Sequence, residues 1–373
     1  MVDGADKRGG PEGTGPEMKG LVLCGGRGTR LRPLTFTRAK QLIPVAGRPV
    51  LFYIIEDLAR TGVPDIGVVV GPDTGPAIRA ALGDGRHWGL RLTFLEQAEP
   101  LGPAHAVGLA ADFVKNSPFV VQLGDCLLEH GLSQGLARYL ALRPDALVLV
   151  APTDDPGRFG VALTEPGGRV VEVAEKPRHP PSNLALVGVY VFGPSVFEAL
   201  ASLRPGPRGE YELTDAVGLL IAAGRRVLAA TVAGWWKDTG TPEDLLEANR
   251  LLLERQAPAV AGQLVGSRVN GCNIVEAGAR IVRSVIRGPV FVGAGAEVLD
   301  AQLGPYVSVG RGARVHGARV SDSVILDGAR LQDVPWPVAG ALIGREAAVE
   351  GGGDRPEPRR LRLLLADDSL VVL

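Results

Sequence analysis

An internal repeat in the last third of the chain constrains the fold more than any other feature of the sequence. Four segments carry an aliphatic residue, a Gly-Ala pair three positions later and a second aliphatic residue: VEAGARI (275–281), VGAGAEV (292–298), VGRGARV (309–315) and ILDGARL (325–331). They begin 17, 17 and 16 residues apart, and aliphatic residues recur about every sixth position between them. This periodicity is typical of a parallel β-helix with glycines at its corners and aliphatic side chains inside. A run of ordinary hairpins, the alternative, does not explain one phase kept four times.

The residues before the repeat predict an α/β domain. We expect buried strands at the short apolar runs 21–24, 66–70, 90–95, 119–123 and 147–150, and helices at 50–60, 77–82, 104–113 and 132–142. Strands that alternate with helices predict a mainly parallel sheet covered on both faces. Hairpin-like pieces at 160–164, 169–173 and 186–192 follow. A helix from about Pro242 to Glu254, N-capped by Thr241, closes the domain.

The resulting organisation has four parts. Residues 1–17 are Gly, Pro and charge and predict a disordered extension, 18–256 form the α/β domain, 257–350 the β-helix, and 351–373 a linker and a capping strand. A near-neutral balance, 40 basic against 41 acidic residues, argues against a dedicated nucleic-acid or membrane-surface binder. No apolar run is long enough for a membrane span or a signal peptide, so we expect a cytoplasmic protein. Three distant cysteines predict neither a disulfide framework nor a four-thiolate zinc site.

A glycine-rich loop follows the first predicted strand. The segment Gly25-Gly26-Arg27-Gly28-Thr29-Arg30 lets backbone N–H groups approach phosphates that a Cβ atom would keep away. Its spacing matches neither the dinucleotide fingerprint nor the P-loop. Five cations lie within or soon after it: Arg27, Arg30, Arg32, Arg38 and Lys40. This density predicts a polyphosphate site, whereas a glycine loop alone would be no more than a tight turn.

Two isolated carboxylates follow predicted strands. Asp125 comes after 119–123, and Asp238 lies in Gly-Trp-Trp-Lys-Asp-Thr-Gly after a strand at 226–231. The carboxyl ends of parallel strands form the edge at which open α/β sheets bind ligands. Two carboxylates there can hold one Mg²⁺, with water and phosphate oxygens completing its shell. Taken singly, either residue could instead be a turn or capping aspartate.

Lysine is scarce, which makes each lysine informative. The chain has six, against 34 arginines, and Lys40, Lys176 and Lys237 lie in motifs. A compact point charge kept where arginine is the default cation suggests a specific role. Glu175-Lys176-Pro177 therefore predicts a positioned phosphate contact.

These motifs, in order, resemble the sugar-1-phosphate nucleotidylyltransferases. The segments are LVLCGGRGTRLRPLT, KQLIPVAGRPVLFYIIEDL, EQAEPLGPAHA, LGD, RFGVAL, EKP, NLALVGVYVF, RGEYELTD and GWWKDTGTPEDLLEANRLLL. The similarity covers residues 19–373 and is greatest to the long form of the glucose-1-phosphate thymidylyltransferases, which carries a C-terminal left-handed β-helix. The resemblance implies a Rossmann-like, GT-A-like nucleotidyltransferase domain followed by that helix. It also implies the transfer of a nucleotidyl group from a nucleoside triphosphate, dTTP by expectation, to glucose 1-phosphate, with Mg²⁺ and release of pyrophosphate.

The resemblance also implies site residues. We expect the catalytic residues to be Arg30, Lys40 and Lys176. The nucleotide would contact Leu23, Gly25, Gly26, Gly28, Thr29, Arg30, Gln97, Gly102 and Asp125, with Gln97 reading the base. The sugar phosphate would contact Gly160, Glu175, Lys176, Asn183, Val187, Arg208 and Trp236. Asp125 and Asp238 would hold the metal.

Two departures from the family pattern leave alternatives open. Cys126 stands where relatives often have asparagine, and Pro103 replaces a leucine beside the base. Another sugar phosphate, a cyclitol phosphate or another nucleoside triphosphate therefore remains an alternative. A second alternative is a bifunctional enzyme whose β-helix is an acyltransferase, which would need His316 as a base. A third is a regulatory or scaffold protein with an inactive catalytic domain. The β-helix has flat sides and exposed ends, so we expect it to pack against the catalytic domain or a second subunit in a homo-oligomer.

Overall fold

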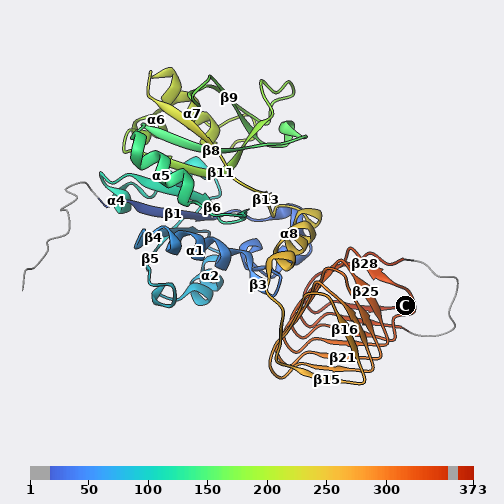
Figure 1. The fold of residues 1–373 in the computed structure, drawn as a ribbon. Coiled ribbons are helices and arrows are strands. Elements are labelled where there is room, and N and C mark those ends of the chain that lie inside the picture. Colours follow the sequence, from blue (N-terminus) through green and yellow to red (C-terminus); the bar gives the residue numbers. More distant parts are fainter. Residues whose placement is uncertain (1–16, 352–359) are drawn as a thin grey trace, which may run out of the picture.

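The computed structural model describes residues 17–351 and 360–373, and within them an α/β domain and a β-helix lie side by side (Figure 1). All but the last residue of the predicted extension, and most of the predicted linker after Gly351, fall outside the described residues. No helix in the described ranges is long and apolar enough to cross a membrane.

A mixed sheet forms the centre of the α/β domain. Its main path runs β10 (Val170–Glu175), β9 (Gly160–Thr164), β11 (Leu184–Phe192), β6 (Phe119–Leu123), β1 (Lys19–Cys24), β4 (Asp65–Val70) and β5 (Arg91–Glu96), and β8 (Ala146–Pro152) joins β12 (Val227–Thr231) to β11. Strands β6, β1, β4 and β5 are parallel, whereas β11 is antiparallel to β6 and β8. The predicted mainly parallel sheet is confirmed.

Helices cover both faces of this sheet, as Figure 1 shows. They are α1 (Val50–Arg60), α2 (Gly75–Leu82), α3 (Pro103–Gly108), α4 (Ala111–Val114), α5 (Ser133–Leu142), α6 (Val196–Ser202), α7 (Leu213–Ala222) and α8 (Pro242–Arg255). Alternate residues of β1 enter opposite cores, Leu21 with one helix layer and Val22 with the other. The prediction of one helix over 104–113 is wrong. The chain breaks into α3 and α4 at Gly108, a poor helix former, where the Ala110 N–H donates to Val107 at 3.0 Å.

The repeat forms three sheets of short parallel strands, consistent with a left-handed β-helix. One sheet contains β14 (Ala259–Val260), β17 (Asn273–Val275), β20 (Val290–Val292), β23 (Val307–Val309), β26 (Ser323–Ile325), β29 (Leu342–Ile343) and β31 (Leu364–Leu365). The second contains β15 (Gln263–Val265), β18 (Arg280–Val282), β21 (Glu297–Leu299), β24 (Arg314–His316), β27 (Arg330–Gln332), β30 (Ala348–Glu350) and β32 (Leu370–Val372). The third contains β16 (Arg268–Asn270), β19 (Val285–Arg287), β22 (Gln302–Leu303), β25 (Arg319–Ser321) and β28 (Val338–Ala339).

The repeat sets the register of the coils. Val275 pairs with Val292, and Val292 with Val309, so the 17-residue spacing is one turn of the helix. The Gly-Ala glycines of the four segments have φ between 65° and 81°, the left-handed conformation that glycine adopts without strain. Beyond Gly351 the tail continues the same ladders, because β31 pairs with β29 and β32 with β30.

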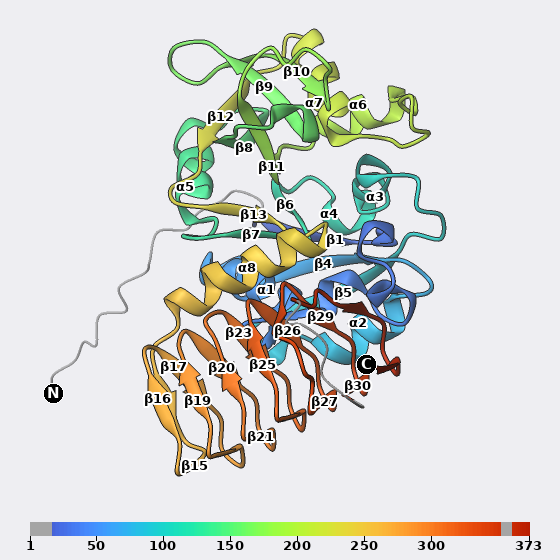
Figure 2. The same ribbon diagram turned by 90° about the vertical axis from the view of Figure 1, so that its right-hand side faces the viewer.

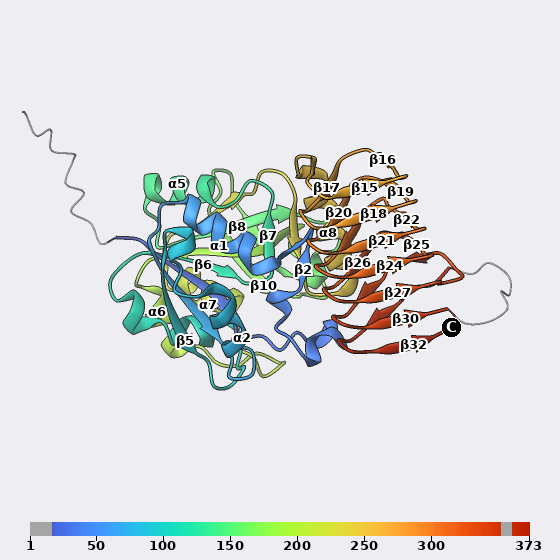
Figure 3. The ribbon, with the colours of Figure 1, turned by 90° about the horizontal axis from the view of Figure 1, so that it is seen from below.

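The β-helix packs against α8 and the hairpin of β2 (Pro44–Val45) and β3 (Arg48–Pro49), as Figures 2 and 3 show. Phe291, Val324, Leu326 and Leu342 belong to the same buried cluster as Ile43 and its neighbours in the first domain. The buried Asn249 of α8 joins the two parts. Its Oδ1 accepts from the Ala46 N–H at 2.8 Å and from the Ser308 hydroxyl at 2.6 Å. The two domains therefore share a core.

Candidate active site

A cavity of about 850 Å³ opens at the carboxyl ends of β1 and β6. Nearly every candidate residue lines it: Leu23, Gly25, Gly26, Gly28, Thr29, Arg30, Lys40, Gln97, Gly102, Asp125, Gly160, Glu175, Lys176, Val187, Arg208, Trp236 and Asp238. Residues from most of the length of the α/β domain thus meet in one place.

Three candidates lie elsewhere. Asn183 is exposed just before β11, where its carbonyl accepts from the Thr153 N–H at 3.0 Å. Arg32 stacks over the Phe36 ring, 4.9 Å from its centroid. Arg38 pairs with Asp367 of the last coil at 3.0 Å. The predicted cation cluster is thus divided, and the members that line the cavity are Arg27, Arg30 and Lys40.

The glycine loop and Lys40 form one packed unit. Gly28 has φ 63° and precedes the short helix η1 (Thr29–Leu31). A Cβ atom on Gly28 would lie 3.0 Å from Lys40 Cβ and 3.1 Å from Thr35 Cγ2. The Thr35 hydroxyl donates to the Gly28 carbonyl at 2.8 Å. Glycine is therefore required here by conformation and by close approach, and the packing brings Lys40 beside the loop.

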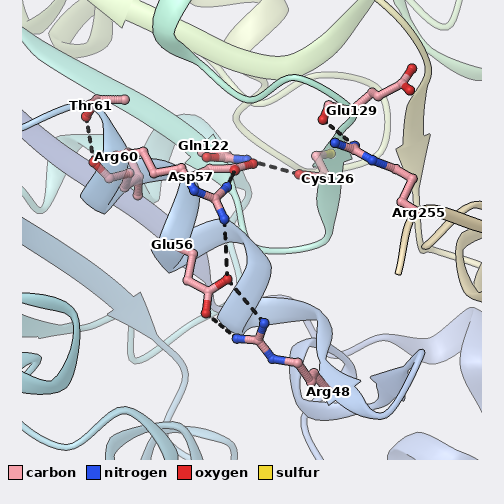
Figure 4. A network of polar contacts seen from close by, with 10 residues as sticks. Arg48, Glu56, Asp57, Arg60, Thr61, Gln122, Cys126, Glu129 and Arg255 are labelled. Carbon is pink, nitrogen blue, oxygen red and sulfur yellow. Dashed lines mark hydrogen bonds and ion pairs between the residues drawn. The ribbon is translucent and has the colours of Figure 1, made fainter. Parts of the chain in front are cut away.

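Backbone pairing brings the two candidate metal carboxylates together. Asp125 precedes β7 (Cys126–Leu128), which pairs antiparallel with β13 (Trp236–Asp238), so that Asp238 lies opposite Cys126. The N–H and hydroxyl of Thr239 both donate to the Asp125 carbonyl at 3.0 Å. On the other side, the buried amide of Gln122 donates to the Cys126 carbonyl at 3.0 Å (Figure 4). The turn that carries Asp125 is therefore held from both sides.

The electrostatics of this pair suit a cation. Burial, together with the neighbouring Asp125, raises the pKa of Asp238 to about 6. Its buried Oδ1 has no hydrogen-bond partner among the described residues. Lys40 donates to Asp125 Oδ2, and although burial opposes its charge, this ion pair raises the pKa of Lys40. The described residues contain no group of three or more His, Cys, Asp or Glu side chains placed for a metal. Two carboxylates, with substrate oxygens as the remaining ligands, nevertheless fit a hard divalent cation.

A second charged cluster lies on the opposite wall. Glu175 Oε1 accepts from Arg208 at 2.9 Å, Glu175 Oε2 accepts from the Thr214 hydroxyl at 2.7 Å, and Lys176 Nζ lies 3.3 Å from Glu175 Oε1. Lys176 has φ 43°, unusual for a residue with a side chain, and its N–H donates to the Phe159 carbonyl at 3.0 Å. Strained backbone of this kind concentrates at functional sites. The cluster therefore holds two cations at a fixed place in the wall.

Gln97 lies at the glycine-loop end of the cavity and is oriented by its neighbours. Its side-chain nitrogen donates to the Gly102 carbonyl at 3.1 Å and lies 3.0 Å from His105 Nδ1. A Cβ atom on Gly25 would lie 2.3 Å from Gln97 Oε1, so a larger residue there would displace the Gln97 amide. The sequence did not point to His105, although its place two residues after Pro103, in the first turn of α3, was a usable signal.

Arg158 also lines the cavity and was missed. Its guanidinium donates to Asp244 Oδ2 at 3.2 Å, and it precedes Phe159, whose ring meets Trp236 edge-on with centroids 4.8 Å apart. Its position in the RFG segment at 158–160 was a possible signal. Lys237, by contrast, turns to Asp244 at 2.8 Å and to Glu247 rather than to the cavity.

The cysteines near the cavity are packing residues. Cys126 is 2% exposed, and burial raises the pKa of its thiol well above the usual range. Burial likewise raises the pKa of Cys24. Since the thiolate is the reactive form, neither residue is an activated nucleophile.

This chain is similar to known proteins over nearly its whole length. The family model described as Nucleotidyl transferase matches residues 19–255. A glucose-1-phosphate thymidylyltransferase of Streptomyces griseus is 44% identical over 94% of this chain and 98% of its own, and one of Streptomyces antibioticus is 43% identical over 95% and 99%. A Bacillus anthracis structure assigned as a glucose-1-phosphate thymidylyltransferase, in complex with sucrose, is 35% identical and superposes with a TM-score of 0.59 over 63% of this chain and 94% of its own. The chain therefore belongs to the nucleotidyl transferase family.

Proposed function

We propose that this protein is a glucose-1-phosphate thymidylyltransferase, which joins dTTP and glucose 1-phosphate into dTDP-glucose and releases pyrophosphate. One observation supports this above all: a single cavity contains the Asp125–Asp238 pair with Lys40 on one side and Lys176 and Arg208 on the other. Two anionic substrates that repel one another need separate cation sites on either side of the reacting phosphorus. The names of the two Streptomyces relatives supply the choice of base and sugar.

In the proposed reaction, a phosphate oxygen of glucose 1-phosphate attacks the α-phosphorus of dTTP. The bond from that phosphorus to the bridging β-oxygen breaks, and pyrophosphate leaves with the electron pair. Arg30 and Lys40 bind the triphosphate and stabilise the charge that develops on the leaving group. Lys176 and Arg208 bind the sugar phosphate and bring its oxygen toward the α-phosphorus. The chain therefore acts by positioning and electrostatics, without a covalent intermediate.

A divalent cation, Mg²⁺ in our proposal, would be held by Asp125 and Asp238. The partnerless Asp238 Oδ1 and the adjacent Asp125 carboxylate are the hard oxygen donors that this ion prefers. When bound, such an ion neutralises phosphate charge and fixes the orientation of the α-phosphate. With Asp125 engaged by that ion, Lys40 would be available to contact the triphosphate.

Specificity in this proposal comes from both ends of the cavity. Gln97, oriented by His105, reads the base. The base lies on a surface formed by Leu23, Gly25 and Gly102. Gly160, Glu175, Val187 and Trp236 line the sugar end, and the exposed Asn183 stays a predicted sugar contact outside the cavity wall.

A pyrophosphate-release assay with a panel of nucleoside triphosphates and sugar or cyclitol phosphates tests the function. We expect the highest kcat/KM for dTTP with glucose 1-phosphate in the presence of Mg²⁺. A higher value for another pair would change the substrates but keep the chemistry, and no release with any pair would overturn the proposal. The acyltransferase alternative would use His316 as its base, and the Nε2 atom of that residue lies 3.8 Å from Glu297 Oε2. Acetyl transfer from acetyl-CoA in the same samples would be needed to support the acyltransferase alternative.

A further inference from the structure

The last coil of the β-helix contacts the loop that carries Lys40. Asp367 lies in the turn between β31 and β32, and its Oδ2 accepts from the Thr37 hydroxyl at 2.9 Å and from Arg38 at 3.0 Å. The Arg38 and Asp367 side chains are only 14% and 11% exposed. Ion pairs that are largely hidden from water are screened less than surface pairs, so this contact is able to hold a loop in place.

The two oxygens of Asp367 do different things. Oδ1 accepts from the Arg345 N–H at 2.8 Å, a corner contact within the β-helix. Asp327, at the corresponding corner of an earlier coil, makes the same contact to the Arg311 N–H at 2.9 Å. Asp367 Oδ2 is directed at the first domain instead. The contact to Thr37 and Arg38 is therefore additional to what the β-helix corner requires.

The held loop is continuous with the candidate active site. Arg38 is two residues before Lys40, which lines the cavity and pairs with Asp125. Thr35, two residues before Thr37, donates to the Gly28 carbonyl. Both ends of the segment 28–40 thus lie at the cavity, and Asp367 holds the segment at Thr37 and Arg38.

We propose that Asp367 is a positioning residue that sets the place of Lys40 and the glycine loop, so that the β-helix contributes to nucleoside triphosphate binding. This inference rests on the proposed function. It predicts an effect confined to one substrate, because the sugar-phosphate cations Lys176 and Arg208 are held by Glu175, on the opposite wall.

Asp367→Asn separates the two roles. The amide oxygen can still accept from the Arg345 N–H, whereas an NH₂ group in place of Oδ2 cannot accept from Thr37 or Arg38. Asp327→Asn is the matched control, because Asp327 accepts from the Arg311 N–H in the same way, whereas Thr37 and Arg38 bond to Asp367. Steady-state kinetics in the full-length chain should show KM for the nucleoside triphosphate raised about tenfold in Asp367→Asn, with KM for the sugar phosphate unchanged. The control should keep both values.

The Arg38 side of the pair gives an independent check. Arg38→Ala should raise the same KM, Arg38→Lys should restore part of it, and the double variant with Asp367→Asn should be no worse than Arg38→Ala. Melting temperatures measured on the same samples show whether each variant is folded. If wild type releases pyrophosphate but Asp367→Asn matches Asp327→Asn in both KM values, the positioning role is wrong. If wild type releases none with any substrate pair, the proposed function itself fails.

Discussion

The ammonium group of Lys40 donates a hydrogen bond to Asp125, the carboxylate that we assign to the metal. Without a cation, Lys40 is therefore the counter-charge of that carboxylate. Coulombic attraction to Asp238 also favours the charged form of Lys40. The proposed metal site and the proposed triphosphate site are thus coupled through one side chain, and binding at one should change the other.

Removal of either carboxylate should abolish turnover without unfolding the chain. Asp125→Asn or Asp238→Asn keeps the size of the side chain but removes the charge that a divalent cation needs. We expect kcat to fall by about a hundredfold or more, a loss comparable with that of a major electrostatic group in an active site. Asp154→Asn, at an exposed position outside the cavity, is the control. Near wild-type rates with Mg²⁺ in either variant would contradict the assignment of that carboxylate to the metal.

The two cavity lysines should divide the work between the substrates. Lys40→Ala should raise KM for the nucleoside triphosphate, because Lys40 lies beside the glycine loop. Lys176→Ala should raise KM for the sugar phosphate, because Lys176 lies in the Glu175 cluster. Equal effects of both variants on both substrates would contradict this division.

Arginine should not replace either lysine. A Cβ position on Gly26 lies 3.6 Å from Lys40 Cε and 3.7 Å from Lys40 Nζ, so the tip of Lys40 lies against the glycine loop and a larger planar guanidinium would displace that loop. We expect Lys40→Arg and Lys176→Arg to lose at least about tenfold in kcat/KM. Steady-state rates at saturating partner substrate measure this, and fully active variants would refute the point-charge explanation of why lysine is present.

His105 should act on nucleotide choice through Gln97. His105→Ala removes one of the two contacts at Gln97 Nε2 and leaves only the Gly102 carbonyl to orient the amide. We expect a KM increase of several-fold for the preferred nucleoside triphosphate, with a smaller preference over its competitors. KM for the sugar phosphate should stay the same. Gln97→Ala should lose the preference among nucleoside triphosphates entirely. If both variants keep that preference, Gln97 and His105 do not read the base.

The sequence predicted the β-helix and the central sheet because the patterns that mark them are local. One repeated phase sets the 17-residue ladder from Val275 to Val292, and the glycine of each segment marks a corner. The alternation in β1 likewise follows from two-sided burial. The break at Gly108 was not foreseen, because an amphipathic pattern does not show where one turn tightens.

The sequence did not predict which carboxylate each cationic side chain pairs with. Arg38 and Lys40 are equally cationic and close in sequence, yet one turns to Asp367 and the other to Asp125. Lys237 adjoins Asp238 but pairs with Asp244. For Arg38 and Lys40 the partners lie 329 and 85 residues away, and no local pattern encodes such tertiary contacts.

The stability of the chain should respond to pH through Asp57. Burial, partly offset by Arg60, raises the pKa of Asp57 from 3.8 to about 6; Figure 4 shows it beside Arg60 and Glu56. The pKa of Asp57 in the folded chain lies above its unfolded value, so folding favours the protonated carboxyl. The contribution of Asp57 to the free energy of unfolding is therefore fully present below pH 3.8 and is lost as pH rises through about 6. A shift of this size corresponds to roughly 3 kcal/mol. Asp57→Asn should reduce the fall in melting temperature between pH 4 and 6.5 without removing it, because the pKa of Asp238 is also raised to about 6, whereas the exposed Asp112→Asn should leave that fall unchanged. Parallel curves for Asp57→Asn and wild type would contradict this.

Deletion of the β-helix should damage solubility and assembly before it damages chemistry. A chain cut after Gln256 keeps the residues that line the cavity but loses Phe291, Val324 and Leu342 from the shared core. Ile43 and its neighbours would then be exposed, and an apolar patch of this kind drives association. Light scattering after gel filtration should show a homo-oligomer for the full chain and an aggregated or altered oligomer for the cut chain, with residual pyrophosphate release. By the Asp367 inference, that residual activity should show a raised KM for the nucleoside triphosphate. A cut chain that is monomeric, soluble and fully active, beside a monomeric full-length chain, would show that the β-helix has neither role.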